Sequence, residues 1–313
     1  GEFFQHSVGR NFLGKIGQGQ EAHGAPPGFH LLVFGLAFWP GSFFAVASLP
    51  FIWARRTNWQ IQYLLCWIIP HWIVFELIAT KLPHYVLPTY PAIALVTGAA
   101  LCCSNNGWNW PHTKLARIAL FVYGGICFIV GMALSLAGIV ISQIIEGRVP
   151  PEAWLVAVGS LPLLILAARA VVITKLKQAA FYGMGSAALI YVGLFLGVIP
   201  RLHQIWLSPR LAAAVNQHLP CSNSEIVSSS FSEPSFVFLM HGKIKFDTSK
   251  NAALMLANNK ACGLALIDRR NEKGFNEELS SKSIKEIEYD RVSGFNYSTG
   301  KWLDIGIYGV LNK

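Results

Sequence analysis

Up to Pro200 the chain alternates between long apolar stretches and short polar turns, and beyond it the apolar runs become short. Each long stretch has roughly the 20-residue length that a helix needs to cross a bilayer. The pattern therefore predicts a multi-pass α-helical membrane protein followed by a small α/β domain. The transmembrane helices are expected at residues 29–53, 60–80, 84–104, 116–142, 153–173 and 179–200.

Three regions follow from this pattern. Residues 1–28 are polar and rich in glycine, and form an extracytoplasmic loop before the first span. Residues 29–200 form the transmembrane helical domain, and residues 201–313 form the extracytoplasmic α/β domain. Because the chain starts with Gly1 and polar loop sequence, without a signal-peptide pattern, we expect it to begin within a longer protein.

The tail pattern predicts a strand, a helix and a strand. The apolar runs FVFLM (236–240) and GLALI (263–267) flank KNAALMLANN (250–259), whose apolar positions suit a short helix. This order indicates a βαβ unit. The last stretch, YSTGKWLDIGIYGV, combines turn residues with alternation and predicts a terminal hairpin or edge strands. We expect structural roles for the polar tail residues His203, Glu233, Asp268, Asn296 and Tyr297.

Composition agrees with a membrane protein and excludes other classes. Hydrophobic residues make up 53% of the chain and charged residues 13%, and the mean hydropathy is +0.44. The net charge of +9 is scattered, so we predict no nucleic-acid partner. Lys and Arg hold loops on the cytoplasmic side, which places every second turn there. These turns carry Arg55, Arg56, Lys114, Arg117, Lys175 and Lys177.

The six cysteines show neither a CxxC pair nor a neighbouring histidine at metal spacing. Most of them read as small apolar residues. Cys221 and Cys262 differ because they lie in the polar tail, where an oxidising compartment would allow them to pair.

The segment KLPHYVLPTYP (81–91) is the most unusual part of the apolar region. Its three prolines exclude a regular helical hairpin, so the backbone must find partners in protein or in a water-filled cavity. Its polar side chains are expected at the depth of a lipid head group. The alternative is that Lys81 extends to the interface and the tyrosines form an aromatic belt. The side chains concerned are Lys81, His84, Tyr85 and Tyr90.

Two ionisable residues, His71 and Glu76, fall inside the second predicted span. A charged group in hydrocarbon costs at least about 2.5 kcal/mol, so such residues have partners or functions. Glu76 is predicted to pair with Lys81, to orient a neighbouring helix, or to meet a substrate. His71 is equally consistent with a neutral ring between helices.

The loop before the first span contains several charged groups, among them Arg10, Lys15 and Glu21. Arg and Lys at a membrane face suit recognition of a phosphate. A solvated loop is the alternative. No DxD sequence for binding a nucleotide sugar through a metal occurs in the chain.

Several motifs resemble those of the bacterial members of the dolichyl-phosphate-mannose protein mannosyltransferase superfamily, which includes the aminoarabinose lipid A transferases. They are FFQHSVGRNFLGK, QEAHGAPPGFHLL, FWPGS, TKLPHYVLPTYPAIAL, EPSFVFL and GFNYSTGKW. The resemblance runs along essentially the whole chain, and KLPHYVLP is its most specific part. Where the aminoarabinose transferases have a histidine in the loop, this chain has Ser7.

The resemblance implies a membrane glycosyltransferase of the GT-C type in the bacterial inner membrane, with its loop and tail in the periplasm. Such an enzyme takes a sugar from a polyprenyl-phosphate carrier and gives it to lipid A, another envelope acceptor or a protein. Arg10, Lys81 and Tyr85 would approach the carrier phosphate, with His84 and Glu76 nearby. The acidic catalytic residues would precede Gly1. No cofactor is predicted. Whether a divalent metal ion takes part is left open, and no residue pattern in the chain supports one.

Two other classes remain as alternatives. A transporter for a lipid-linked sugar would use His71, Glu76 and the broken segment to line a pathway. A membrane scaffold would bind envelope partners through its tail. Loss of Arg10 or Lys81 is expected to abolish sugar transfer but to leave the partner binding of a scaffold intact.

Overall fold

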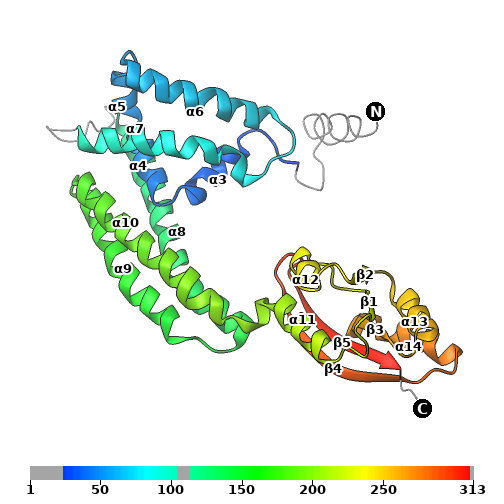
Figure 1. Cartoon of the computed structure of the whole chain (residues 1–313). Coiled ribbons are helices and arrows are strands. Elements are labelled where there is room, and N and C mark those ends of the chain that lie inside the picture. Colours follow the sequence, from blue (N-terminus) through cyan, green and yellow to red (C-terminus); the bar gives the residue numbers. More distant parts are fainter. Residues whose placement is uncertain (1–23, 104–112, 311–313) are drawn as a thin grey trace, which may run out of the picture. The chain divides into compact units, whose positions relative to one another are not determined.

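The computed structural model describes residues 24–103 and 113–310, and the chain divides into two compact units. The helical unit comprises the residues up to Val140 together with Pro150–Gly197. The α/β unit comprises Ile141–Val149 and the residues from Val198 onward. Both units are drawn in Figure 1.

The helical unit begins with short helices and continues with long ones (Figure 1). A 3-10 helix, η2, separates α6 from α7, and a π-helical turn, η3, follows α10. The elements are α3 (Phe29–Ala37), α4 (Gly41–Ala47), α5 (Leu49–Ala54), α6 (Trp59–Leu77), η2 (Pro83–Thr89), α7 (Tyr90–Cys102), α8 (Lys114–Glu146), α9 (Pro151–Val172), α10 (Leu176–Val192) and η3 (Gly193–Val198).

Candidate spans in the described residues agree with most of the predicted ones. Four helical segments are long and apolar enough to cross a membrane, and α3 with α4 forms a fifth if this pair, bent by 120°, is one span. The expectation of one helix over 29–53 was therefore wrong, because the chain bends next to Pro40, which lacks a backbone N–H. The segment 60–80 forms α6, which is not among the candidate spans. Gln60, Gln62 and Glu76 make it more polar than its neighbours.

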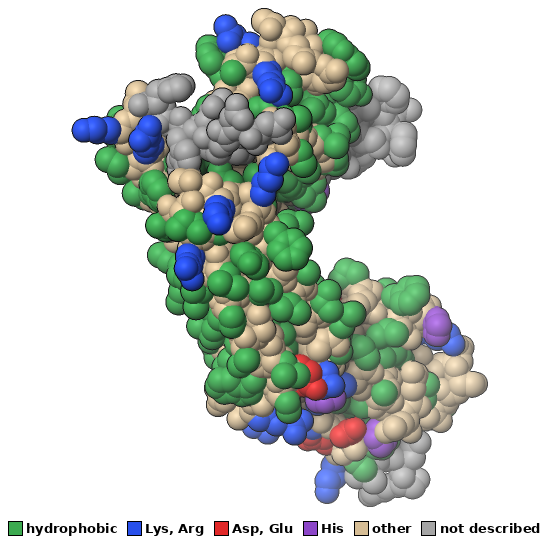
Figure 2. All heavy atoms as spheres, turned by 90° about the vertical axis from the view of Figure 1, so that its left-hand side faces the viewer, with side chains coloured by type: hydrophobic (Ala, Val, Ile, Leu, Met, Phe, Trp, Pro, Cys, Tyr) green, Lys and Arg blue, Asp and Glu red, His purple; other side chains and the backbone are tan. Residues whose placement is uncertain are grey.

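The core of the helical unit lies between α4, α8, α9 and α10. Trp39 and Phe43 are buried against Leu120, Leu164 and Ile190. On their outer faces the long helices leave large apolar side chains uncovered, as Figure 2 shows for the face in view. An apolar exterior on helices of this length suits contact with hydrocarbon.

Two of the basic turns approach one another at one end of the helical unit. Lys177, in the first turn of α10, donates a hydrogen bond to the carbonyl of Cys102, the last residue of α7, at 3.3 Å. Lys and Arg side chains gather around this end in Figure 2. The contact agrees with the predicted placement of these turns on a single side of the membrane.

The α/β unit contains a five-stranded mixed sheet in the order β2-β1-β3-β5-β4. Strands β1, β2 and β3 are parallel, β5 is antiparallel to β3, and β4 pairs only with β5. The unit also contains short 3-10 turns: η4 (Ile199–Arg201), η5 (His203–Ile205) and η6 (Arg269–Asn271). Its other elements are α11 (Leu207–Gln217), β1 (Glu225–Ser228), α12 (Pro234–Leu239), β2 (Ile244–Phe246), α13 (Ser249–Asn258), β3 (Gly263–Asp268), α14 (Glu272–Ser281), β4 (Glu286–Asn296) and β5 (Lys301–Val310).

Helices cover both faces of this sheet. Along β3, Leu264 and Leu266 lie in the core under α11 and α12, whereas Ala265 and Ile267 lie in the core under α13 and α14. All six residues of β3 are buried, as expected for a central strand covered on both sides. The unit is thus a three-layer α/β/α domain.

The tail predictions were mostly confirmed, with one correction. The 250–259 helix appears as α13, GLALI as β3, and the terminal hairpin as β4 and β5. FVFLM (236–240) is not a strand: its first four residues belong to α12 and Met240 is the C-cap, while Pro234 occupies the first turn and Phe236 is buried. The βαβ unit is formed by β2, α13 and β3 instead. Cys221 and Cys262 form a disulfide.

Candidate functional site

The turn that contains KLPHYVLP forms a compact corner between α6 and α7. Helix α6 ends at Leu77, and Pro83 and Pro88 hold the backbone of η2 in a 3-10 helix before α7 begins at Tyr90. An isolated β-bridge joins Thr80 to Gly24. The corner is therefore fixed on one side by the segment that leads into α3.

Lys81 is buried in this corner, with 3% of its surface exposed. Its ammonium group donates hydrogen bonds to the carbonyl oxygens of Ile78 at 2.6 Å, Glu76 at 2.8 Å and Phe75 at 3.4 Å. These are carbonyls that the end of a helix leaves unpaired, and a cation there also complements the helix dipole. Lys81 thus caps the C-terminus of α6, and its ammonium group is held inside the corner.

Glu76 caps a different helix. Its carboxylate accepts hydrogen bonds from the backbone nitrogens of Gly28 at 2.8 Å and Leu31 at 3.1 Å, in the first turn of α3. Gly28 provides no side-chain cap and has a φ of 97°, in the left-handed region that favours glycine. Of the roles predicted for Glu76, orientation of a neighbouring helix is confirmed.

His30 lies between Glu76 and the residue that follows Lys81. It was not identified from the sequence. Its ring is buried, and Nε2 lies 3.1 Å from the carbonyl oxygen of Leu82. Because a carbonyl only accepts, Nε2 carries the proton. The other ring nitrogen, Nδ1, lies 3.8 Å from Glu76 Oε2. A histidine at the start of an apolar stretch was the only signal available in the sequence.

Rings and one hydrogen bond fix the other half of the corner. His71 Nε2 lies 2.9 Å from the carbonyl oxygen of Tyr85, so this histidine of α6 has a partner in η2. The Tyr85 ring lies between Phe75 and His84, at centroid distances of 5.1 Å from each. Since His84 is exposed and Tyr85 half-buried, these two side chains form the accessible rim of the corner.

The structure thus brings four predicted site residues together: Glu76, Lys81, His84 and Tyr85. Arg10, the fifth, lies outside the described residues. Among the residues that the structure describes, no group of three or more His, Cys, Asp or Glu side chains is placed to hold a metal ion.

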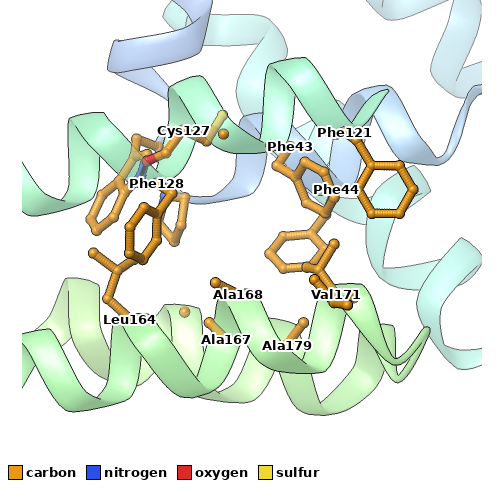
Figure 3. Close-up of a pocket in the computed structure, with 16 residues that line it drawn as sticks. Phe43, Phe44, Phe121, Cys127, Phe128, Leu164, Ala167, Ala168, Val171 and Ala179 are labelled. Atoms are coloured by element: carbon orange, nitrogen blue, oxygen red, sulfur yellow. Dashed lines mark hydrogen bonds between the residues drawn. The ribbon is translucent and has the colours of Figure 1, made fainter. Parts of the chain in front are cut away.

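A cavity of about 290 Å³ lies elsewhere in the helical unit, between α4, α8, α9 and α10. Figure 3 shows the rings of Phe43, Phe121 and Phe128 on one side of it and the small side chains of Ala167 and Ala168 on the other. Its lining contains no charged side chain. A pocket of this size and character accommodates an apolar group or a segment of hydrocarbon chain.

Three of the five polar tail residues make structural contacts, as predicted: Asn296, Glu233 and Asp268. The side chain of Asn296 accepts hydrogen bonds from the backbone nitrogens of Ser298 at 2.9 Å and Thr299 at 3.3 Å. Ser298 Oγ donates to Glu233 Oε2 at 3.1 Å. Asp268 accepts from Asp304 N at 3.1 Å. These contacts shape turns and join neighbouring elements.

A cluster around Arg291 holds together β4, β5 and α14, and nothing in the sequence pattern indicated it. The guanidinium contacts Glu288 and Glu272 at 2.6 Å and the hydroxyl of Tyr308 at 2.8 Å. Hydrogen bonding to Glu288 and Glu272 raises the pKa of Arg291, against the effect of burial. Burial also raises the pKa of Tyr308. The cluster is satisfied internally, which is typical of a structural role.

The described residues therefore define a multi-pass helical membrane protein with a three-layer α/β domain. No family model matches the chain. Its fold is similar to part of ArnT from Cupriavidus metallidurans. It matches the structure bound to undecaprenyl phosphate with a TM-score of 0.59 at 13% identity, and the match covers 98% of this chain and 56% of that one. The apo structure gives a TM-score of 0.56 at 15% identity, over 98% and 57% of the two chains.

Curated relatives have a matching name. The chain is 31% identical over 99 residues to the undecaprenyl phosphate-alpha-4-amino-4-deoxy-L-arabinose arabinosyl transferase of Pseudomonas aeruginosa, over 32% of this chain and 17% of the relative. It is 30% identical over 95 residues to the protein of that name from Wigglesworthia glossinidia brevipalpis, over 30% and 16% of the two chains. The expected resemblance is confirmed. These alignments span less than a fifth of each relative, and the structural match just over half of the solved chain.

Proposed function

We propose that this protein acts in a membrane glycosyltransferase that moves a sugar from a polyprenyl-phosphate carrier to lipid A or another envelope acceptor. The observation that carries the proposal is the ArnT fold, shared over 98% of the chain with a structure bound to undecaprenyl phosphate. The named arabinosyl transferases among its relatives support the same reaction class.

The corner between α6 and α7 is the part of the described structure proposed to face the carrier head group. As the glycosidic bond breaks, negative charge develops on the leaving phosphate, and cations held in place stabilise it. Arg10 and Lys81 are the proposed cations. Because Lys81 already donates to three carbonyls, contact with a phosphate requires it to exchange at least one of them. Tyr85 and His84 supply polar groups at the rim.

We place the α/β unit and the corner on the periplasmic side of the membrane. The disulfide between Cys221 and Cys262 supports this side, since disulfides persist in oxidising compartments. The basic end of the helical unit would face the cytoplasm under the positive-inside rule.

The test is sugar transfer by the full-length protein reconstituted with an undecaprenyl-phosphate-linked sugar and lipid A. Arg10→Ala and Lys81→Met are each expected to reduce transfer at least about 100-fold, as removal of one donor to a developing oxyanion does in other enzymes. Lys273→Met, on the exposed surface of α14, is the matched control and should transfer normally. Normal transfer by both Arg10→Ala and Lys81→Met would overturn the proposed phosphate contacts.

A transporter of the lipid-linked sugar is the second candidate, favoured by the bent pair of α3 and α4. Transporters built from inverted repeats carry two interrupted spans, whereas one bent pair occurs among the described residues. Movement of a labelled carrier across the membrane of vesicles that contain no acceptor would favour the transporter. Transfer only when lipid A is present favours the glycosyltransferase.

A further inference from the structure

The turn between β4 and β5 presents aromatic side chains to solvent. We call residues 295–302, with the sequence FNYSTGKW, the hairpin tip. Tyr297 is 64% exposed and Trp302 is 49% exposed. Phe295 pairs with Trp302 across the hairpin, with ring centroids 5.4 Å apart. The tip therefore carries three aromatic rings within eight residues.

These rings add little to the core of the domain, which has its own aromatic residues. Phe231, Phe236 and Phe275 are 3% exposed or less, and they pack under the helices. Exposed apolar groups that gather at one place mark an interaction surface more often than single ones do. The tip thus exposes aromatic surface that the core of the domain leaves uncovered.

The tip is also rigid. Asn296 accepts two backbone hydrogen bonds within the turn, and Gly300 takes a φ of 67°, a left-handed conformation that other residues disfavour. The bond from Ser298 to Glu233 fixes the turn to the start of α12. Helix α12 in turn exposes Phe238, at 81%. A fixed turn presents its rings without further loss of conformational entropy.

Chemistry and connectivity both favour a lipid surface as the partner. Tyr and Trp combine an apolar ring with a polar group, and they concentrate where membrane meets water. Lys301 adds positive charge, and residues 295–302 contain no acidic residue. The last candidate span ends at Arg201, and α11 begins at Leu207, so the chain keeps the domain close to a bilayer surface.

We propose that the hairpin tip docks on the surface of the bilayer, with Tyr297 and Trp302 in the interfacial layer and Lys301 against lipid phosphates. The domain is then held at the membrane by two attachments, its covalent link to the last span and this tip. This contact is independent of sugar transfer, and it holds whether or not the proposed reaction does.

Photocrosslinking of the full-length protein in native membranes tests the docking. Benzoylphenylalanine replaces Tyr297 in one variant and Trp302 in another, and Glu277 on the exposed surface of α14 in the control. We expect phospholipid adducts, detected by mass spectrometry of the peptides, at positions 297 and 302 but not at 277. Crosslinks from the tip to another protein or to this chain, in place of lipid, would overturn the proposal. Equal lipid labelling at all three positions would also overturn it.

A second measurement examines the charge. In nanodiscs that contain phosphatidylglycerol, Lys301→Glu is expected to reduce lipid adducts at position 297 at least about five-fold, because loss of one basic residue near an anionic surface already has about this effect. Lys282→Glu, at an exposed position after α14, is the matched control. An unchanged yield in Lys301→Glu would contradict the phosphate contact.

Discussion

Glu76 Oε2 lies 2.8 Å from the backbone nitrogen of Gly28, forty-eight residues earlier in the chain. Glu76 lies one residue before the end of α6, an ordinary position for a solvent-facing carboxylate, yet its side chain caps α3. Lys81, just past the same helix end, caps α6 itself. The two opposite charges therefore stabilise two helix ends at one corner.

Loss of the Glu76 cap is expected to destabilise the helical unit. Glu76→Ala leaves the amides of Gly28 and Leu31 without their acceptor, which costs about 1 kcal/mol for a helix cap. The melting temperature of the purified protein in detergent should fall accordingly. The melting temperature of Glu76→Gln, which keeps an acceptor oxygen, should fall less. Glu277→Ala should leave the melting temperature unchanged. Identical melting of Glu76→Ala and the unmodified protein would contradict the cap.

Substitution of Lys81 separates its structural contact from its proposed contact with phosphate. Lys81→Met removes hydrogen bonds from a charged donor, worth about 2 kcal/mol, and leaves the carbonyls of Glu76 and Ile78 without it. We expect lower thermal stability in Lys81→Met even without carrier. Addition of undecaprenyl phosphate should raise the melting temperature of the unmodified protein more than that of the variant. Equal stabilisation of both would show that Lys81 does not contact the carrier.

Removal of the disulfide should destabilise the α/β unit. Cys221 and Cys262 are separated by 41 residues, and closing a loop of this length contributes roughly 4 kcal/mol in the chain-entropy account. Cys221→Ser combined with Cys262→Ser should therefore lower the free energy of unfolding by a few kcal/mol. Limited proteolysis followed over time measures this, with cleavage expected first in residues 218–263. Cys102→Ser, a free cysteine in the helical unit, serves as the control.

Asp268 is expected to contribute an acid-sensitive part of the stability. Burial by itself raises the pKa of Asp268, but hydrogen bonds from Arg270 and from the Asp304 backbone outweigh it, so the pKa lies below its ordinary value. A carboxyl whose pKa is lower in the folded state stabilises the fold above its unfolded pKa of about 4, and this contribution is lost as the pH falls further. Asp268→Asn should unfold more easily at neutral pH.

The pH dependence provides the check on Asp268. Thermal unfolding of the unmodified protein and of Asp268→Asn is compared from pH 7 down to pH 3. The difference in melting temperature should be largest at neutral pH and should shrink below about pH 4. A difference that stays constant across this range would mean that the Asp268 charge does not contribute. Glu277→Gln, an exposed acid on α14, is the control.

Patterns that depend on local sequence were predictable. The length and apolarity of α8, α9 and α10 follow from composition alone. The alternation of apolar and small or polar residues in β5 indicated a strand, although Ile305–Val310 are buried on both faces. The error at α12 has a physical reason. Phe and Val favour strands, but Pro234 in the first turn starts a helix, and it was the signal to weigh.

The partners within the corner were not predictable. Ionisable residues in or next to a predicted span must find partners, and the sequence indicated that much for Lys81 and Glu76. Their actual partners are backbone carbonyls and amides, which every residue possesses and which leave no trace in a side-chain pattern. His30 was missed for the same reason, since its partner is the carbonyl of Leu82.

The position of β5 in the sheet has a consequence for synthesis on the ribosome. Among the strands of the described residues β5 comes last, yet it lies between β3 and β4, and β4 pairs with no other strand of this set. Until Lys301–Val310 has left the exit tunnel, the edge of β3 that pairs with β5 has no hydrogen-bonding partner. The α/β domain therefore completes its fold only after translation has passed β5, when the preceding spans are already made.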